Sequence, residues 1–416
     1  MIKLIGTYYR FLRNGITKQA PVQLTLFVTS RCNIRCKMCF YWEPIESPTR
    51  EEITLPEVEA ISKSLPKFFW LLIGGGEPFV RQDLPQIVHA FYRQNGIRHL
   101  SIPTNGTFPK QIVERTEEIL RLCPGLFFNL NLSLNGLEKD HDELCQTEGV
   151  FKKLLVTYEG LCELKRRYKN LGLGINITHT CHSQEHLLTV IDFVADKLTG
   201  VDNISLGMVR GRPKDSSSMN VDVKFYKRAV ERIEALAVQR KLRTFRSLFG
   251  GIAFAKDMIM RRLIAKTMKS GYQIPCFAGR ISLVIDEKTN VYPCEMLPAV
   301  GNLRDSHLDA RTILRGAQLA EAVEKISCEN CFCTHECFYS TNILFNPNLW
   351  GLLLWRYVQF RARQFVGAKD AGDFDDLTLP DPHVQTSYSG QRGGLYKGRN
   401  FAQLTASERK TTTRPF

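Results

Sequence analysis

Three closely spaced cysteines are the residues of this sequence that most clearly suggest chemistry. Cys32, Cys36 and Cys39 form a C-x3-C-x2-C pattern directly after an apolar run. Three thiolates on one short loop can each bind a different iron of a [4Fe–4S] cluster. The fourth iron then lacks a protein ligand and can be chelated by the amino and carboxylate groups of a small molecule. That arrangement can push an electron into a sulfonium and break its C–S bond.

A zinc site, or three unrelated buried thiols, is the alternative reading of this loop. A closed structural zinc site needs four ligands, and no further Cys or His lies close by in the sequence. The position of the loop after the first strand of a repeated strand–helix pattern favours the cluster.

A second motif, Gly74-Gly75-Gly76-Glu77-Pro78, follows the next apolar run. Glycines allow the backbone to approach a ligand closely, and a carboxylate beside them can accept hydrogen bonds from an ammonium group. A simple strand-to-helix turn would explain the glycines equally well.

With these two motifs, residues 22–210 resemble the radical S-adenosylmethionine (SAM) superfamily. The resemblance implies that the chain reductively cleaves SAM at the three-cysteine [4Fe–4S] cluster to form a 5′-deoxyadenosyl radical. The radical would then take hydrogen from a C–H bond of a substrate that the sequence does not name. An external one-electron reductant of the flavodoxin or ferredoxin type is implied, and so is sensitivity to oxygen.

The resemblance also implies which residues contact SAM. Gly75, Gly76 and Glu77 match the motif that binds the methionine amino group. Met38 stands where the family usually has an aromatic residue and offers an apolar surface near the adenine. Ends of later strands supply polar candidates, with Asn135 where the family usually has Asp; these are Thr104, Asn105, Ser133 and Asn135, together with Asn176 and Arg210.

A second set of cysteines lies in a short, turn-rich region at 271–340. The segment from Ser282 to Cys294 predicts a β-hairpin with its turn at Glu287–Asn290. A zinc ribbon is the alternative to an iron–sulfur site. The set comprises Cys276, Cys294, Cys328, Cys331, Cys333 and Cys337.

This region resembles the SPASM and twitch domains that follow many radical SAM barrels. Val-Tyr-Pro-Cys at 291–294 carries the match, although Thr289 replaces the usual glycine and no cysteine follows Cys337. The resemblance implies at least one auxiliary iron–sulfur cluster. The remaining cysteines have no ligand spacing and are predicted to be buried apolar fillers; they are Cys123, Cys145, Cys162 and Cys181.

The elements that must position these residues alternate between short β-branched runs and amphipathic runs. Strands that alternate with helices imply parallel βαβ units, and six units predict an α/β fold with a partial (β/α)6 TIM-like barrel. Chemistry in such barrels lies on the loops after the strands, where each motif falls. The predicted strands are 22–29, 68–73, 99–103, 127–134, 172–178 and 203–209.

The domain division follows from these patterns and from changes in composition. We expect an amphipathic segment at 1–21, the radical SAM barrel at 22–240 and a helical linker at 241–270. A SPASM/twitch-like domain is expected at 271–342. An aromatic, basic helix and a disordered tail are expected at 343–416.

Composition limits the classes of protein that the chain can belong to. The chain has 416 residues, of which 44% are hydrophobic and 24% charged, and this indicates a globular protein. The start of the chain has no secretion signal and no apolar run long enough to span a bilayer, so a cytoplasmic location is expected. The net charge of +14 and the grouped cysteines leave a zinc-dependent nucleic-acid-binding protein as the alternative function.

Two terminal segments suggest contact with the inner face of the cytoplasmic membrane. Residues 1–20 and 349–365 combine aromatic and basic residues at helical spacing, as do helices that lie in a membrane interface. Reversible membrane contact is therefore a hypothesis. Packing of both segments on the barrel is favoured over it, because amphipathic helices usually face a core.

Overall fold

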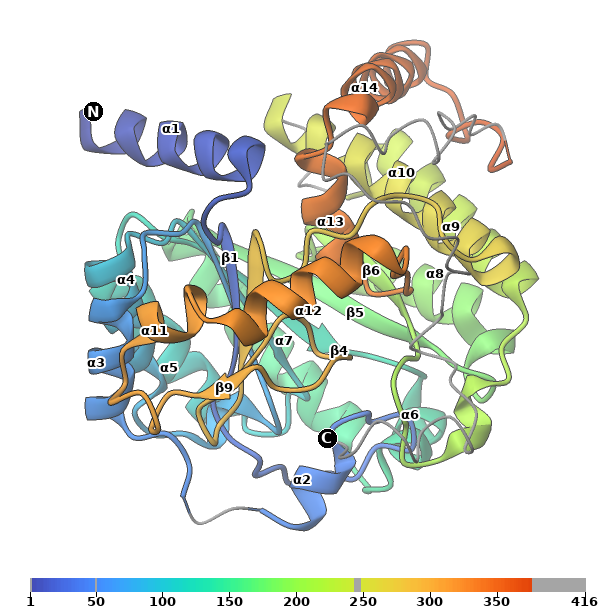
Figure 1. Ribbon diagram of the computed structural model, residues 1–416. Helices are drawn as coiled ribbons and strands as arrows, with labels where there is room; N and C mark the ends of the chain where they lie inside the picture. The colour runs from blue at the N-terminus through green and yellow to red at the C-terminus, as the bar shows by residue number, and fades with distance from the viewer. Residues whose placement is uncertain (1, 49–50, 243–247, 376–416) are drawn as a thin grey trace.

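A curved sheet wrapped by helices forms the structure, a computed structural model that describes residues 2–48, 51–242 and 248–375 (Figure 1). The nine strands run in the order β6-β5-β4-β3-β2-β1-β7-β8-β9. All pairings from β6 to β7 are parallel, and β8 and β9 add antiparallel. The strands are β1 (Gln23–Phe27), β2 (Trp70–Gly74), β3 (His99–Thr104), β4 (Phe127–Ser133), β5 (Leu171–His179), β6 (Asn203–Met208), β7 (Ser282–Ile285), β8 (Asn290–Tyr292) and β9 (Gly301–Asn302).

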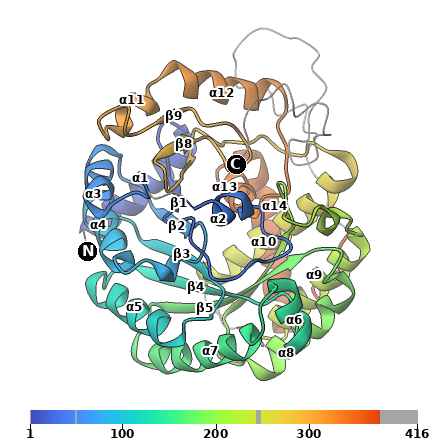
Figure 2. The same ribbon diagram turned by 90° about the horizontal axis from the view of Figure 1, so that it is seen from below.

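Helices connect the parallel strands and cover the outside of the sheet, so that the predicted partial α/β barrel is confirmed (Figure 2). The six predicted strands correspond to β1–β6, with small shifts at their ends. The helices up to β7 are α1 (Ile2–Thr17), α2 (Trp42–Glu46), α3 (Leu55–Ser64), α4 (Leu84–Asn95), α5 (Pro109–Leu122), α6 (Glu138–Cys145), α7 (Val150–Arg167), α8 (Leu187–Lys197), α9 (Val223–Val238) and α10 (Leu248–Ser270). After β9 come α11 (Ala310–Leu314), α12 (Ala317–Cys328), α13 (Glu336–Leu344) and α14 (Trp350–Phe365).

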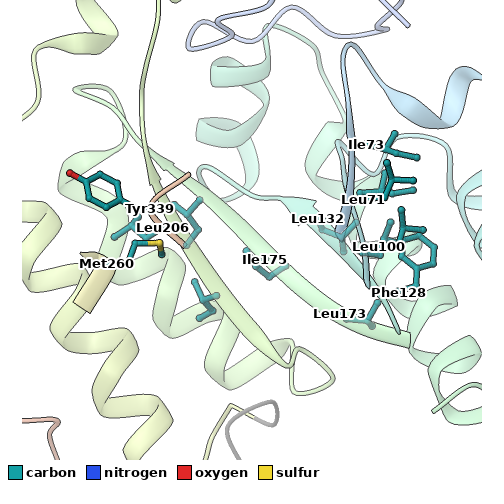
Figure 3. Close-up of a cluster of buried hydrophobic side chains, with 14 of the residues drawn as sticks. Leu71, Ile73, Leu100, Phe128, Leu132, Leu173, Ile175, Leu206, Met260 and Tyr339 are labelled. Atoms are coloured by element: carbon teal, nitrogen blue, oxygen red, sulfur yellow. The ribbon is translucent and has the colours of Figure 1, made fainter. Parts of the chain in front are cut away.

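The alternation of side chains along the strands places the core between sheet and helices. Leu71, Leu100 and Phe128 are at most 1% exposed and belong to one continuous apolar cluster (Figure 3). The side chains between them face the inside of the barrel and include polar ones. Asn131 donates to Ser101 Oγ at 3.0 Å and accepts from Asn129 at 2.8 Å. The barrel therefore keeps a polar interior beneath the ends of its strands.

The cysteine-rich region continues the barrel sheet. Its first strand, β7, pairs with β1 in parallel, and β7 and β8 form the hairpin that the sequence predicts at Glu287–Asn290. Thr289 in this turn has φ of 66°, a conformation that glycine adopts more readily than a β-branched residue. The division into domains remains a prediction, and the predicted disordered tail lies, from residue 376, outside the described residues.

Candidate functional site

The loop that carries Cys32, Cys36 and Cys39 follows β1 and rests against the end of α6. Arg35 N–H donates to the Cys145 carbonyl at 3.2 Å, and Lys37 N–H donates to the Leu144 carbonyl at 3.0 Å. The Arg35 guanidinium folds back to the Cys32 carbonyl at 2.7 Å. These bonds hold the three cysteines on one wall of an open cavity of about 300 Å³.

The three cysteines of this loop are half-buried in the cavity wall. Burial raises the pKa of Cys32 and of Cys39 to about 12. A thiol must lose its proton to bind iron. The positive charge of the iron would have to offset the cost of burying the thiolate charge. Among the described residues, no three Cys, His, Asp or Glu side chains are placed to hold a single metal ion. Thiolates of a cubane need not converge in this way, because each binds a different iron.

The opposite walls of the cavity come from the carboxyl ends of successive strands. Every residue that the sequence proposes for SAM contact lines the cavity: Met38 does so from the cysteine loop, and the strand ends supply Gly75, Gly76, Glu77, Thr104, Asn105, Ser133 and Asn135, with Asn176 and Arg210. Parallel strands bring their carboxyl ends to one edge of a sheet, which explains why residues far apart in the sequence meet here. Their individual roles remain predictions.

Glu77 is the most constrained carboxylate in the cavity wall, with 2% of its surface exposed. It accepts hydrogen bonds from Thr104 Oγ1 at 2.8 Å, from Asn105 N–H at 2.8 Å and from Phe79 N–H at 3.2 Å. Burial raises its pKa to about 7. Since a carboxylate has about four acceptor positions, Glu77 keeps room for one further donor, such as an ammonium group.

The glycines before Glu77 serve contact between two loops. A Cβ on Gly75 would lie 2.3 Å from the Thr29 carbonyl oxygen, and one on Gly76 would lie 2.1 Å from the Arg31 carbonyl oxygen. The Gly76 and Glu77 amides donate to these same carbonyls at 2.7 and 2.9 Å. The sequence predicted that these glycines let the backbone approach a ligand. In the structure they let it approach Thr29 and Arg31, which joins the glycine loop to the start of the cysteine loop.

Asn105 ties the end of β3 to the cysteine loop. Its amide group donates to Asn33 Oδ1 at 3.0 Å, and its oxygen accepts from Thr107 N–H at 2.9 Å. Asn33 in turn donates to Thr107 Oγ1 at 2.8 Å. Asn33, Asn105 and Thr107 are thus joined in a closed set of hydrogen bonds, which fixes the cysteine loop against the end of β3.

A buried histidine and a fourth cysteine stand behind Cys36, and the sequence analysis proposed neither as a site residue. The backbone N–H of Asn135 donates to His141 Nδ1 at 3.2 Å, so the proton of the neutral ring lies on Nε2. His141 Nε2 faces Cys145 Sγ at 3.7 Å. Burial lowers the pKa of His141 to about 4. The Cys145 thiol is the hydrogen-bond partner of Cys36, a contact that raises the Cys36 pKa, as burial also does. Cys145, predicted to be a filler, lines the cavity; its i,i+4 spacing from His141 was the available signal.

The second cysteine set divides in the structure. Cys276, Cys294, Cys331 and Cys333 line one apolar pocket together with His335 and Tyr339. Burial raises the pKa of the Cys333 thiol to about 12. Two predicted ligands, Cys328 and Cys337, do not line this pocket, and Cys328 is exposed.

A buried polar chain that was not predicted from the sequence joins the two cysteine sites. Glu295 Oε2 lies 3.2 Å from Arg210, which lines the first cavity, and 2.8 Å from His335 Nε2, which lines the second pocket. The Arg210 guanidinium covers the Phe40 ring at 4.7 Å. Although burial raises the pKa of Glu295, His335 and Arg210 lower it to about 2. An ionised carboxylate therefore lies between the two sites.

Comparisons with known proteins agree with this geometry. Residues 26–190 match the radical SAM superfamily. Fe-coproporphyrin III synthase of Methanosarcina barkeri is 30% identical over 153 residues, 36% of this chain and 35% of that protein. GTP 3′,8-cyclase of Aquifex aeolicus is 32% identical over 101 residues, 23% of this chain and 31% of that protein. The chain spans about a third of the length of these two relatives.

Among solved structures, native anSMEcpe with bound AdoMet superposes with a TM-score of 0.53 at 15% identity. The match covers 83% of this chain and 98% of that chain, and at this identity it shows the fold alone. A parallel partial barrel with a cysteine loop after its first strand defines the class of protein. The match to the radical SAM superfamily covers residues 26–190, the part of the chain that carries the end of β1, the cysteine loop and strands β2 to β5.

Proposed function

We propose that the protein is a radical SAM enzyme that binds SAM at a [4Fe–4S] cluster held by Cys32, Cys36 and Cys39. One observation carries the proposal: the three cysteines and the polar ends of successive strands line the same cavity. When bound, the cluster would supply the electron that cleaves SAM to a 5′-deoxyadenosyl radical. An external one-electron reductant would provide that electron.

The residues of the chain would bind and orient SAM. Glu77 is proposed to accept from its amino group, and Met38, only 8% exposed, to pack near the adenine. Ser133 and Asn135 would offer polar contacts from the end of β4. The side-chain oxygen of Asn135 already accepts a hydrogen bond from Thr178 N–H at 2.7 Å, so its side-chain NH2 group would make the contact with SAM. The radical would take hydrogen from a C–H bond of the substrate, which we propose to be a peptide, a protein or a small or lipid-linked molecule.

We further propose one auxiliary iron–sulfur cluster on Cys276, Cys294, Cys331 and Cys333. These four line one pocket, whereas Cys328 and Cys337 lie outside it. Four thiolates satisfy an iron–sulfur cluster completely. The Arg210–Glu295–His335 chain would then separate the two clusters and fix the walls of both sites.

The test is Cys36→Ala in protein reconstituted with iron and sulfide without oxygen. We expect the variant to release no 5′-deoxyadenosine from SAM in the presence of dithionite, while a Cys181→Ala control, which lies outside both pockets, remains active. Undiminished release from Cys36→Ala would overturn the assignment. Protein that contains zinc and no sulfide would instead support the nucleic-acid-binding alternative.

A further inference from the structure

Exposed apolar side chains are concentrated on the first and last helices. Of the twelve large hydrophobic side chains that are exposed among the described residues, ten lie on α1, on α14 or directly after α14. The other two are Phe127 and Val156. We call the ten residues the terminal-helix surface: Tyr8, Tyr9, Leu12, Ile16, Trp350, Leu354, Trp355, Val358, Phe365 and Val366.

Helix α14 carries apolar side chains on both of its faces, with Leu352, Leu353 and Phe360 against the core. Its outer face exposes 62% of Leu354 and 57% of Trp355. Its inner face buries Arg356 and Gln364 beside Phe360, and Gln364 donates to the Ala237 carbonyl at 3.1 Å. Water disfavours such an outer face, so the arrangement indicates an apolar environment beside it.

Helix α1 meets the segment that leads into α14, although more than 300 residues separate the two helices. Phe11 of α1 contacts Phe345, which lies between α13 and α14, with ring centroids 5.1 Å apart. Trp350 at the start of α14 donates from Nε1 to the Leu344 carbonyl at 2.9 Å. Figure 1 shows α1 and α14 at the same end of the molecule, opposite α2 and α6.

The charge beside α1 is positive, whereas Arg363 of α14 pairs with Asp370 at 2.6 Å. The sequence has no Asp or Glu before Glu43 and none between Cys337 and Lys369. A cavity of about 570 Å³ beneath α1 has Arg10, Lys67, Arg93 and Arg98 in its walls and no acidic residue. Apolar and aromatic side chains beside such cations complement an anionic lipid surface.

We propose that the terminal-helix surface lies on a bilayer of anionic lipids, with α1 and α14 in the interface. No helix among the described residues is long and apolar enough to cross a membrane, so the contact is peripheral. Tyr and Trp suit this depth, because their rings are apolar and their polar atoms can face headgroups. This proposal does not depend on the proposed SAM chemistry.

The experiment is flotation of the full-length chain with vesicles of phosphatidylcholine alone or with phosphatidylglycerol added. We expect binding to the anionic vesicles that weakens as salt increases. The double variant Leu354→Glu/Trp355→Glu should bind at least about ten-fold less, since it removes apolar area and adds negative charge. Val156→Glu changes an equally exposed side chain on α7 and should bind like the unaltered protein.

Three results would overturn the proposal. The first is equal behaviour of the double variant and the unaltered protein in flotation. The second is the absence of binding together with a dimer that the double variant converts to a monomer, which would assign the surface to a second copy. The third is binding that appears only after residues 376–416 are removed, which would assign the surface to the chain's own tail. Circular dichroism of each variant checks that the fold is kept.

Discussion

At the scale of single residues, His99 shows how burial sets the response of the fold to pH. The ring lies at the amino-terminal end of β3 between Phe69 and Phe127, with centroids 5.1 and 5.4 Å away. Burial lowers the pKa of His99 to about 4. An unfolded chain takes up the proton near pH 6.5, whereas the folded protein does not. The contribution of neutral His99 to stability is therefore complete above pH 6.5 and is lost as the pH falls toward 4.

The variant His99→Phe should reduce this loss. Phenylalanine keeps the aromatic packing and removes the proton uptake, so the free energy of unfolding should fall less between pH 7 and pH 4.5. The fall in the free energy of unfolding between these two pH values should be smaller in His99→Phe than in the unaltered protein by about 2–3 kcal/mol. Urea titrations at the two pH values measure it, and the exposed His186→Gln serves as control. An unchanged pH slope in His99→Phe would contradict the assignment.

The residues of the first site were predictable where the signal is local. The spacing of Cys32, Cys36 and Cys39 lies within eight positions, and the strand-end motifs are equally short. Glu295 was not predictable, because it acquires its role from partners far away in the sequence, whereas Cys145 had a local signal in its i,i+4 spacing from His141. Glu295 meets Arg210 across 85 positions. Only the folded chain brings such partners together.

At the scale of elements, a buried ion pair joins α9 to α10. Arg262 contacts both carboxylate oxygens of Glu234 at 2.8 and 3.1 Å, and both side chains are 1% exposed. The guanidinium also faces the Phe374 ring at 4.9 Å. The Arg262 guanidinium of α10 thus contacts both α9 and the segment at Phe374.

Loss of one partner of this pair should be costly. Arg262→Met leaves the Glu234 carboxylate buried without its cation and should lower the free energy of unfolding by about 3–5 kcal/mol. The double variant Arg262→Met/Glu234→Leu should recover most of the loss, because no charge remains buried. Urea denaturation measures both. Equal destabilisation of the single and the double variant would show that packing, rather than charge, dominates here.

The six barrel strands were predictable because their apolar runs are strong and regularly spaced. The pairing of β7 with β1 was not, since no local pattern states which strand a new strand will join. The sequence also suggested that residues 349–365 would most simply pack with their apolar side inward. In the structure Leu352, Leu353 and Phe360 pack against the core, but Arg356 and Gln364 are buried beside them while Leu354 and Trp355 stay exposed.

At the scale of the whole molecule, the two cysteine sites should load iron independently. The Cys32→Ala/Cys36→Ala/Cys39→Ala variant should retain about half of the iron and sulfide of the reconstituted protein, on the four cysteines of the second pocket. Iron and sulfide analysis measures this, and Mössbauer spectra identify the cluster type. A folded triple variant without iron would remove the auxiliary cluster from the proposal.

The polarity of the barrel has a consequence for the route by which substrate arrives. Helix α1 enters at the amino-terminal ends of the strands, whereas the cavity opens at their carboxyl ends. The longest strand, β5, has nine residues, which corresponds to roughly 30 Å at about 3.3 Å per residue. With both terminal helices in a lipid interface, the mouth would stand somewhat less than that length above the headgroups, because barrel strands tilt by about 35–45° from the axis, and would open toward bulk water. A lipid whose reactive carbon lies at headgroup depth could not reach it, so the fitting substrates are dissolved molecules or the far ends of long, extended headgroups.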